Sequence, residues 1–274
     1  MLPPHEIDTF VDAFTGSGIV SMNTKAKRYI LNDIDEHLAQ LYSLFSDNTA
    51  ESIIAHIEEY IEKYELPKER TKRNVFSDKE KIEKYKSSYF AFRDEYNKDK
   101  SNTFMFYTLM FFSFSQQFRF NGKGEFNMPF GNDCFTDKNK EYIRNGCNFF
   151  QNNDVVRTAK DFRGLDYDKL TQNDFVYFDP PYSITLSVYN ENRDGRKGWT
   201  TQDDKDLFEI CDSLTANGVK FAMSNVFSNK GNINDELITW CERNKYNVYS
   251  FDSHTYTACG KGNSNAKEVL IMNY

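Results

Sequence analysis

The stretch that decides the fold class is Phe175-Val176-Tyr177-Phe178, followed directly by Asp179-Pro180-Pro181-Tyr182. Four residues that favour β structure predict a buried strand, and the two prolines lock the turn that ends it. Open α/β sheets bind their ligands beyond the carboxyl ends of their strands. We therefore expect the Asp179 carboxylate to face a pocket.

The chemistry that such a turn suits is transfer onto the exocyclic amino group of a nucleobase. The lone pair of that nitrogen is conjugated into the ring, so a site must draw its hydrogens out of the ring plane with acceptors. Asp179 supplies one acceptor. The carbonyl of Pro180 supplies a second, because Pro181 lacks the N–H that would engage it in a helix. Tyr182 offers a flat face for the base, and such stacking contributes ~1–3 kcal/mol. The alternative is a plain Pro-Pro turn with a solvated aspartate, but the whole tetrapeptide after an apolar strand favours a functional site.

The amino-terminal region predicts another part of the same sheet. Residues Thr9 to Phe14 predict a short strand, and Thr15-Gly16-Ser17-Gly18 predicts a tight turn whose glycines let the backbone approach a ligand. The third glycine of a dinucleotide fingerprint is absent, because Ser21-Met22 follow Val20. NAD binding is therefore not favoured.

A further strand, Tyr29 to Asn32, ends at Asp33. An acidic residue at the end of the second strand can accept hydrogen bonds from both ribose hydroxyls of a nucleoside, whether that nucleoside belongs to NAD or to S-adenosylmethionine. Asp33 is the favoured residue for this role, and Asp35 is the alternative.

These motifs resemble those of the Dam-type (D12 class) DNA adenine N6-methyltransferases. The resemblance rests on Asp179 to Tyr182 and on Phe14 to Gly18, stands in the family's order, and spans nearly the whole chain. It implies direct methyl transfer from S-adenosylmethionine to the N6 of a flipped adenine in duplex DNA, with no metal. It assigns catalysis to Asp179, Pro180, Pro181 and Tyr182, and cofactor binding to Phe14, Thr15, Gly16, Ser17, Gly18, Asp33, Asp161 and Phe162.

The pair Asp161-Phe162 follows the strand predicted at Val155 to Lys160. By resemblance Asp161 accepts a hydrogen bond from the amino group of the cofactor's adenine, and Phe162 packs on the ring. An aspartate that caps a turn over a core phenylalanine is the alternative.

The segment from Arg119 to Gly131 predicts a β-hairpin, because Asn121-Gly122 lies between residues compatible with β structure. A two-stranded ribbon fits the major groove of DNA. The segment resembles the target-recognition hairpin of Dam-type enzymes. Members that read GATC carry an arginine after the Pro-Phe-Gly element, whereas this chain has Asn132-Asp133, so the resemblance does not extend to GATC recognition. The resemblance and the residue types assign DNA binding to Arg119, Asn121, Lys123, Asn127 and Pro129, and to Ser224 and Asn225, which line the target-base pocket in the family.

Charge is distributed unevenly along the chain. The net charge is −7, yet the residues from Lys63 to Lys123 contain 14 Lys and Arg against 8 Asp and Glu, a local excess of 6 that leaves −13 for the remainder. A basic middle in an acidic body fits a DNA-facing module on a cofactor-binding core. A solvated, charge-laced helix over Lys79 to Lys100 is the alternative.

The remaining sequence completes an α/β pattern with an insertion. A core helix is expected over His37 to Phe45, and the aromatic run Phe104 to Phe114 favours the buried core of the insert over a stacking platform. Further expectations are a helix over Lys138 to Phe150, a loop over Ser183 to Trp199 that closes over DNA, a helix starting at Thr200 or Thr201, and strands over Val219 to Met223, Val248 to Phe251 and Glu268 to Met272, the last two antiparallel.

The predicted architecture is therefore an α/β, Rossmann-like sheet of S-adenosylmethionine-dependent methyltransferase type, with an inserted helical target-recognition domain that carries the hairpin. Residues 1–46 and 134–274 form the predicted catalytic domain, and residues 47–133 form the predicted insert. A chain of 274 residues is long enough for both.

Composition excludes several classes of protein. The five cysteines form no CxxC pair and the four histidines are dispersed, so neither a disulfide framework nor a metal site is expected. No apolar run approaches the ~20 residues of a membrane span. The amino terminus lacks the layout of a signal peptide, which favours the cytoplasm.

Two rival functions stay open at this point. An enzyme of the same chemistry acting on RNA adenine or on cytosine N4 could share the tetrapeptide, and so could a catalytically weak relative that only binds DNA or cofactor. Dam-type enzymes place a Tyr/Trp-, Gly- and Lys-containing segment before the first strand, whereas only Met1 to Asp8 precede Thr9 here. We expect either a start upstream of Met1 or a shortened relative with an open cofactor site. Double-stranded DNA is the expected partner, with a cognate restriction endonuclease that acts separately.

Overall fold

The computed structural model describes residues 6–71, 79–184, 198–252 and 266–274. These residues form two compact units. The first, which we call the sheet unit, contains residues 6–39, 153–184, 198–252 and 266–274; the second, the helical unit, contains residues 40–71 and 79–152. The predicted loop over Ser183 to Trp199 falls almost entirely outside the described residues.

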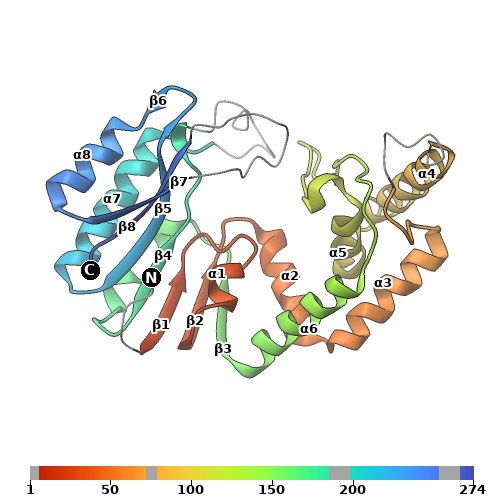
Figure 1. Ribbon diagram of the computed structural model, residues 1–274. Coiled ribbons are helices and arrows are strands. Elements are labelled where there is room, and N and C mark those ends of the chain that lie inside the picture. Colours follow the sequence, from red (N-terminus) through yellow and green to blue (C-terminus); the bar gives the residue numbers. More distant parts are fainter. Residues whose placement is uncertain (1–5, 72–78, 185–197, 253–265) are drawn as a thin grey trace. The chain divides into compact units, whose positions relative to one another are not determined.

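The sheet unit is built on one mixed sheet with the order β3-β2-β1-β4-β5-β8-β7 (Figure 1). Strands β1 to β5 pair in parallel along this order, whereas β8 pairs antiparallel with both β5 and β7. The expected α/β class and the antiparallel ending are confirmed. The strands are β1 (Ile7–Asp12), β2 (Ala26–Asn32), β3 (Asp154–Thr158), β4 (Phe175–Phe178), β5 (Lys220–Asn229), β6 (Asn232–Ile233, which pairs with β5), β7 (Asn247–Asp252) and β8 (Lys267–Met272).

Helices α7 (Thr201–Ala216) and α8 (Asp235–Asn244) pack against this sheet (Figure 1). Helix α7 begins where predicted, because Thr200 and Asp203 form a capping box. The rings of Phe208 and Trp240 stack at 4.3 Å, and the shared core includes Phe178 of β4. The central strand β4 is thus held rigidly up to the turn that follows it. Shorter elements of this unit are α1 (Ile19–Met22), η3 (Phe162–Gly164) and η4 (Tyr167–Lys169).

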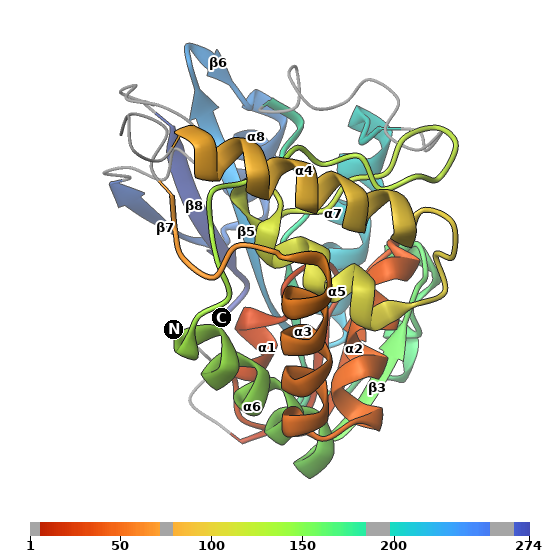
Figure 2. The same ribbon diagram turned by 90° about the vertical axis from the view of Figure 1, so that its right-hand side faces the viewer.

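The helical unit contains α3, α4, α5 and α6, with α3, α4 and α5 in mutual contact (Figure 2). Its core is aromatic: Tyr89, Phe92, Phe106 and Phe112 are at most 1% exposed. The prediction that the aromatic run is core is confirmed for α5, although Phe114 at its end is exposed. The elements are α3 (Ala50–Tyr64), α4 (Lys79–Tyr96), α5 (Thr103–Phe112), η2 (Phe114–Gln116) and α6 (Asp137–Asn152).

Helix α2 (Glu36–Asp47) runs from one unit into the other. Its second half belongs to the helical unit because Tyr42 and Phe45 stack on Phe150 of α6, at 5.3 and 6.0 Å between ring centroids. The two compact units have other boundaries than the predicted domains, which are residues 1–46 with 134–274 and residues 47–133. The predicted domains are defined by function, so they stay a prediction.

Candidate functional site

The carboxyl edge of the parallel strands brings together acidic residues that are far apart in the sequence. Asp12 ends β1 and lies opposite Leu31 of β2 and Tyr177 of β4. Asp33 directly follows β2, and Asp179 directly follows β4. Because β4, β1 and β2 are neighbours in one parallel sheet, three carboxylates share one edge, which is where such sheets bind ligands.

The predicted catalytic tetrapeptide is partly tied together. The Tyr182 hydroxyl donates a hydrogen bond to Asp179 Oδ1 at 2.8 Å. Although Asp179 as a whole residue is exposed, protein surrounds its carboxylate closely enough for desolvation to raise its pKa; the hydrogen bond from Tyr182 opposes this, and repulsion from Glu268 of β8 adds to it. Pro180 is buried, and its carbonyl accepts no hydrogen bond from any described residue. One carboxylate oxygen of Asp179 is thus engaged by Tyr182, and the roles of Asp179 and Pro180 as acceptors for a substrate stay predictions.

Ser224 and Asn225 lie near the middle of β5, the strand that pairs with β4. The Ser224 hydroxyl shares a 2.7 Å hydrogen bond with the Tyr177 hydroxyl, across the neighbouring strands β5 and β4. Asn225 is 3% exposed, and its side-chain Oδ1 accepts from the backbone N–H of Val226 at 2.8 Å. Ser224 is thus linked to β4, whereas Asn225 is held within its own strand.

The glycine turn after β1 is held against the end of β2. The N–H of Thr15 donates to the carbonyl of Asn32 at 2.8 Å, and the N–H of Gly16 donates to Asp33 Oδ2 at 3.0 Å. Gly16 and Gly18 have φ of 51° and 72°, a region that glycine enters without steric cost. Ser17 is exposed between them. The structure thereby brings the predicted turn and the predicted ribose-binding aspartate into direct contact.

Asp33 and its alternative Asp35 are also connected. Asp33 Oδ1 accepts from the N–H of Asp35 at 2.9 Å, while the Asp35 carboxylate caps the first turn of α2 through the N–H of His37 at 3.0 Å. Asp35 therefore serves the helix, and Asp33 stands closer to the glycine turn.

Asp12 is a residue of this edge that sequence reasoning missed. It is 1% exposed, and its Oδ2 accepts from the Ser21 hydroxyl at 2.6 Å. Its Oδ1 is buried and has no partner among the described residues. Desolvation raises the pKa of Asp12 to about 7; the bond from Ser21 opposes this shift, and repulsion from Asp179 and Asp33 adds to it. The available signal was an acidic residue inside an apolar strand, two positions before the motif that starts at Phe14.

Asn32 is a second residue of this edge that sequence reasoning missed, and its side chain connects the ends of three strands. Its Nδ2 donates to the carbonyls of Ala13 and Lys160 at 3.1 and 3.0 Å, and its Oδ1 accepts from Thr158 Oγ1 and the N–H of Lys160 at 2.7 and 3.1 Å. One buried carboxamide thus joins the ends of β1, β2 and β3. Such a fully satisfied buried group fixes one arrangement of the strands.

The Asp161-Phe162 pair differs in its two members. Asp161 is exposed, caps η3 through the N–H of Arg163 at 2.9 Å, and forms an ion pair with the Arg163 guanidinium at 3.0 Å. Phe162 is 4% exposed, and its ring packs at 5.3 Å on Phe14 and at 5.4 Å on Trp199. Asp161 thus takes the arrangement of the capping alternative. The roles of both residues toward a cofactor stay predictions.

In the helical unit, the predicted hairpin segment is a loop closed by an isolated antiparallel bridge between Phe120 and Phe126. Backbone hydrogen bonds from Asn121 N to Glu125 O and from Asn127 N to Arg119 O, both 2.9 Å, flank the bridge. No named strands form there within the described residues. We call residues 119–128 the recognition loop, after the role that the sequence predicts for this segment.

Arg119 and Asn127 form a pair on this loop. Arg119 Nε donates to Asn127 Oδ1 at 2.7 Å, and Arg119 Nη2 donates to the Asn127 carbonyl at 3.2 Å. Asn121 instead donates to Glu125 Oε2 at 2.8 Å, Lys123 is exposed at the loop tip, and the Pro129 carbonyl accepts from the N–H of Phe114 at 2.8 Å. Among the residues predicted to contact DNA, Arg119 and Asn127 are joined through their side chains, and the N–H of Lys123 donates to Asn121 Oδ1 at 2.9 Å.

Two expected absences can be compared with the described residues. In these residues no group of three or more His, Cys, Asp or Glu is arranged to hold a metal ion. Of the described helices, none is both long and apolar enough to cross a membrane.

The fold and the acidic sheet edge fit one class of protein, and comparison with known proteins identifies it. The chain belongs to the family described as D12 class N6 adenine-specific DNA methyltransferase, whose family model matches residues 1–257. Membership implies S-adenosylmethionine as the methyl donor.

Named relatives agree with this family. The chain is 37% identical over 279 residues to Type II methyltransferase M.FokI of Planomicrobium okeanokoites and 34% identical over 277 residues to Modification methylase StsI of Streptococcus sanguinis; each alignment covers 99% of this chain and 40% of the relative. It is 25% identical over 249 residues to DNA adenine methylase of Escherichia coli K12, covering 88% of this chain and 78% of that protein. The chain thus spans about 40% of the length of the first two relatives.

Proposed function

We propose that this chain transfers the methyl group of S-adenosylmethionine to the N6 of an adenine in double-stranded DNA. The observation that carries the proposal is the convergence of Asp12, Asp33 and Asp179 at one sheet edge, next to the Gly16–Asp33 contact, in a chain of this family.

The residues of this edge suit a cofactor that is positively charged. S-adenosylmethionine, when bound, supplies a methyl group activated by a sulfonium and also carries an ammonium group. Asp12 has a buried oxygen without a partner among the described residues, and a buried polar atom of that kind calls for a donor or a cation. In the proposal Phe14 to Gly18 and Asp33 hold the nucleoside part, Asp161 and Phe162 flank its adenine, and Asp12 balances positive charge.

Asp179 and Pro180 act on the target base. Asp179 Oδ2 and the Pro180 carbonyl accept the two hydrogens of the exocyclic amino group, which frees the nitrogen lone pair for attack. Tyr182 supplies a stacking face while its hydroxyl fixes the rotamer of Asp179. Pro181 keeps the turn rigid. Flipping the base out of the duplex costs a few kcal/mol, which these contacts offset. Ser224, linked to Tyr177, and Asn225 line the pocket for that base.

The recognition loop and the rest of residues 47–133 form the DNA target-recognition domain in this proposal, and residues 1–46 with 134–274 form the catalytic domain. Arg119 and Asn127 act as the base-reading pair, Asn121 and Pro129 shape the loop, and Lys123 contacts phosphate. The relatives named as modification methylases support a cognate restriction endonuclease that acts separately, with both proteins working on cytoplasmic DNA.

Labelled-methyl transfer by the purified chain tests the proposal. Unmethylated duplex DNA and RNA of matched sequence are incubated with methyl-labelled cofactor, and the products are digested to nucleosides. Label in N6-methyldeoxyadenosine is expected from DNA alone. Label in RNA, or in N4-methyldeoxycytidine, would establish one of the rival functions. Cofactor binding without transfer would indicate a catalytically weak relative.

A further inference from the structure

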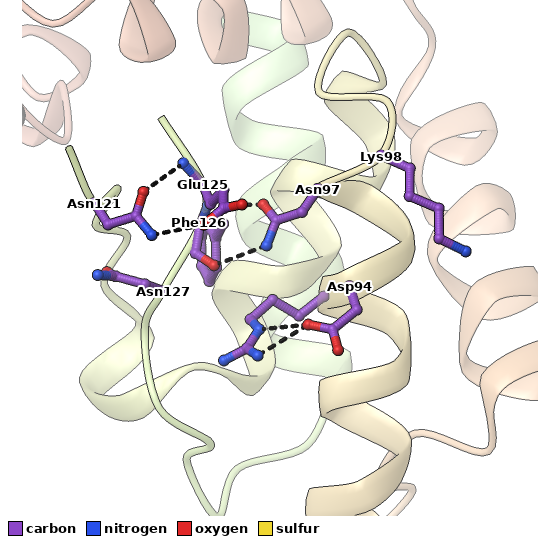
Figure 3. Close-up of a pocket in the computed structure, with 8 residues that line it drawn as sticks. Asp94, Asn97, Lys98, Asn121, Glu125, Phe126 and Asn127 are labelled. Carbon is purple, nitrogen blue, oxygen red and sulfur yellow. Dashed lines mark hydrogen bonds and ion pairs between the residues drawn. The ribbon is translucent and has the colours of Figure 1, made fainter. Parts of the chain in front are cut away.

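Side chains of helix α4 and of the residue after it form hydrogen bonds with the backbone of the recognition loop. Asn97, one residue past the end of α4, accepts a hydrogen bond from the N–H of Phe126 at 2.8 Å and donates one to the carbonyl of the same residue at 3.1 Å (Figure 3). The Tyr89 hydroxyl on α4 donates to the carbonyl of Met128 at 2.9 Å. The two contacts therefore fall on either side of Asn127.

Side chains alternate across this stretch as they do along a strand. Phe126 and Met128 are 1% and 6% exposed, and Phe126 packs edge-on against Phe120 and Tyr96 at 5.7 and 6.2 Å. Asn127 lies between them and is half-buried. Because successive side chains of extended backbone point to opposite sides, the inward pair forces Asn127 outward, toward Arg119.

Asn97 substitutes for a missing strand neighbour. The loop has a single bridge, so the Phe126 N–H and carbonyl that face away from Phe120 have no ladder partner. A carboxamide places an acceptor oxygen and an N–H donor side by side, as a neighbouring strand does, and Asn97 uses one of each on Phe126. We call the two hydrogen bonds between Asn97 and Phe126, drawn in Figure 3, the clasp. Both residues line a recess of about 360 Å³, together with Arg93, Asn121 and Asn127.

The direction of Arg119 depends on this arrangement. Asn127 engages Arg119 Nε and Nη2, and Nη1 has no acceptor among the described residues. The two hydrogen bonds to Asn127 thus fix the direction of the outer edge of the guanidinium, which is formed by Nη1 and Nη2. A bidentate contact with a base edge needs such a fixed direction, whereas a phosphate contact tolerates rotation.

We propose that Asn97, assisted by Tyr89, is a positioning residue for sequence recognition: it fixes the backbone at Phe126 and thereby aims the Arg119–Asn127 pair at a base edge. This inference rests on the proposed function, and it names residues of α4 and its end that determine specificity without touching DNA bases.

Three variants of the full chain test the inference. Asn97→Ala removes both clasp bonds, and Tyr89→Phe removes one bond while keeping the ring in the core. Ser87→Ala is the matched control, because within the described part of the chain the exposed Ser87 hydroxyl bonds only to the Glu83 carbonyl of its own helix. Sequencing of modified bases first defines the preferred site of the wild type. The ratio of methylation rates at that site and at sites with one changed base pair is then measured for each variant, together with thermal unfolding and cofactor binding.

The inference predicts that Asn97→Ala, which removes two hydrogen bonds, lowers this preference ratio about fivefold or more, and that Tyr89→Phe, which removes one, lowers it by roughly 2- to 13-fold. Ser87→Ala should leave it unchanged, and cofactor binding should be the same in all. A uniform loss of rate with an unchanged ratio in both Asn97→Ala and Tyr89→Phe would overturn the inference.

Amide hydrogen exchange separates failure of the clasp from failure of the proposed function. In Asn97→Ala the Phe126 amide should exchange about 2- to 13-fold faster, while amides of α3 and α5 stay protected. If the wild type methylates nothing, the proposed function fails, and this exchange result then judges the clasp: local loss of protection supports it and unchanged protection overturns it.

Discussion

The acidic sheet edge and the recognition loop place their functional groups by opposite means. At the edge, Asp12, Asp33 and Asp179 come from distant parts of the sequence and meet because β2, β1 and β4 pair in parallel. On the loop, Arg119 and Asn127 are eight residues apart and lie next to the single bridge between Phe120 and Phe126. Uncharged side chains of α4 and of the residue after it, Tyr89 and Asn97, hold that bridge in place. The edge depends on topology, whereas the loop depends on a few local hydrogen bonds.

The two regions also differ in what their arrangement costs. Burial raises the pKa values of Asp12 and Asp179; repulsion from Asp179 and Asp33 adds to the shift of Asp12, and repulsion from Glu268 adds to that of Asp179. The ionised form of both carboxyls is therefore unfavourable until a cation or a hydrogen-bond donor binds. The loop buries neutral groups that are hydrogen-bonded. Substitutions at the edge should therefore change chemistry and pH dependence, and substitutions in the loop should change selectivity.

The largest expected effect is at the edge. Asp179→Ala should lower the single-turnover rate of methyl transfer by roughly a hundred- to a thousandfold, because a preorganised acceptor for the reacting amino group is lost. Its affinity for S-adenosylmethionine should stay within a few fold. Asp33→Ala should do the reverse and weaken cofactor binding first, as measured by titration calorimetry. An Asp179→Ala protein with wild-type single-turnover rates would remove Asp179 from the chemistry.

The next effect concerns pH. The pKa of Asp12 is about 7 in the folded chain, above its ordinary value of 3.8, so between about pH 4 and pH 7 only the folded state holds this proton. Stability therefore falls as pH rises through that window, by up to about 1.4 kcal/mol per unit from this group, and levels off above it. Asp12→Asn should abolish this contribution. In urea unfolding, the stability of Asp12→Asn relative to the wild type should therefore increase from pH 5 to pH 7. Parallel curves for the two proteins would show that Asp12 is ionised throughout.

A third effect tests the packing beneath the loop. A Cβ on Gly131 would lie 2.6 Å from the backbone oxygen of Ser113, which cannot move away easily. Gly131→Ala should lower the free energy of unfolding by about 1–3 kcal/mol. Gly122→Ala is the control, because nothing lies within 4 Å of its Cβ position. Equal unfolding midpoints for the two variants would contradict the close approach.

The smallest effects distinguish the loop's own residues. Arg119→Ala should cost about 1–3 kcal/mol at the preferred site and relax the preference at one base pair, while Lys123→Ala should weaken binding to all sequences alike and reduce the salt dependence. Competition binding to duplexes that differ at single positions measures both. An equal loss of affinity for all sequences in Arg119→Ala would show that Arg119 contacts phosphate and not a base edge.

The sequence was sufficient for the sheet and for most of its edge. The apolar run ending at Phe178 and the glycine turn predicted where two neighbouring strands end, and the α/β class alone led to the prediction of a ligand site beyond them. Asp12 was missed because the acidic residue inside an apolar strand marks only its position, whereas its place beside Tyr177 depends on the parallel register of β1 and β4. Asn97 was missed because its partner, Phe126, lies 29 residues away. The Asn121-Gly122 pair suggested a regular hairpin, yet the chain forms a wider loop in which Gly124 N bonds to Asn121 O at 2.8 Å.

The measurement that tests the central claim most directly is single-base sequencing of modified DNA from cells that express this chain in a background without adenine methylation. We predict N6-methyladenine at one short recurring sequence, and its disappearance when Asp179→Ala replaces the wild type. Modification at cytosine, or adenine methylation that persists in Asp179→Ala, would contradict the assignment of this edge to adenine N6 transfer.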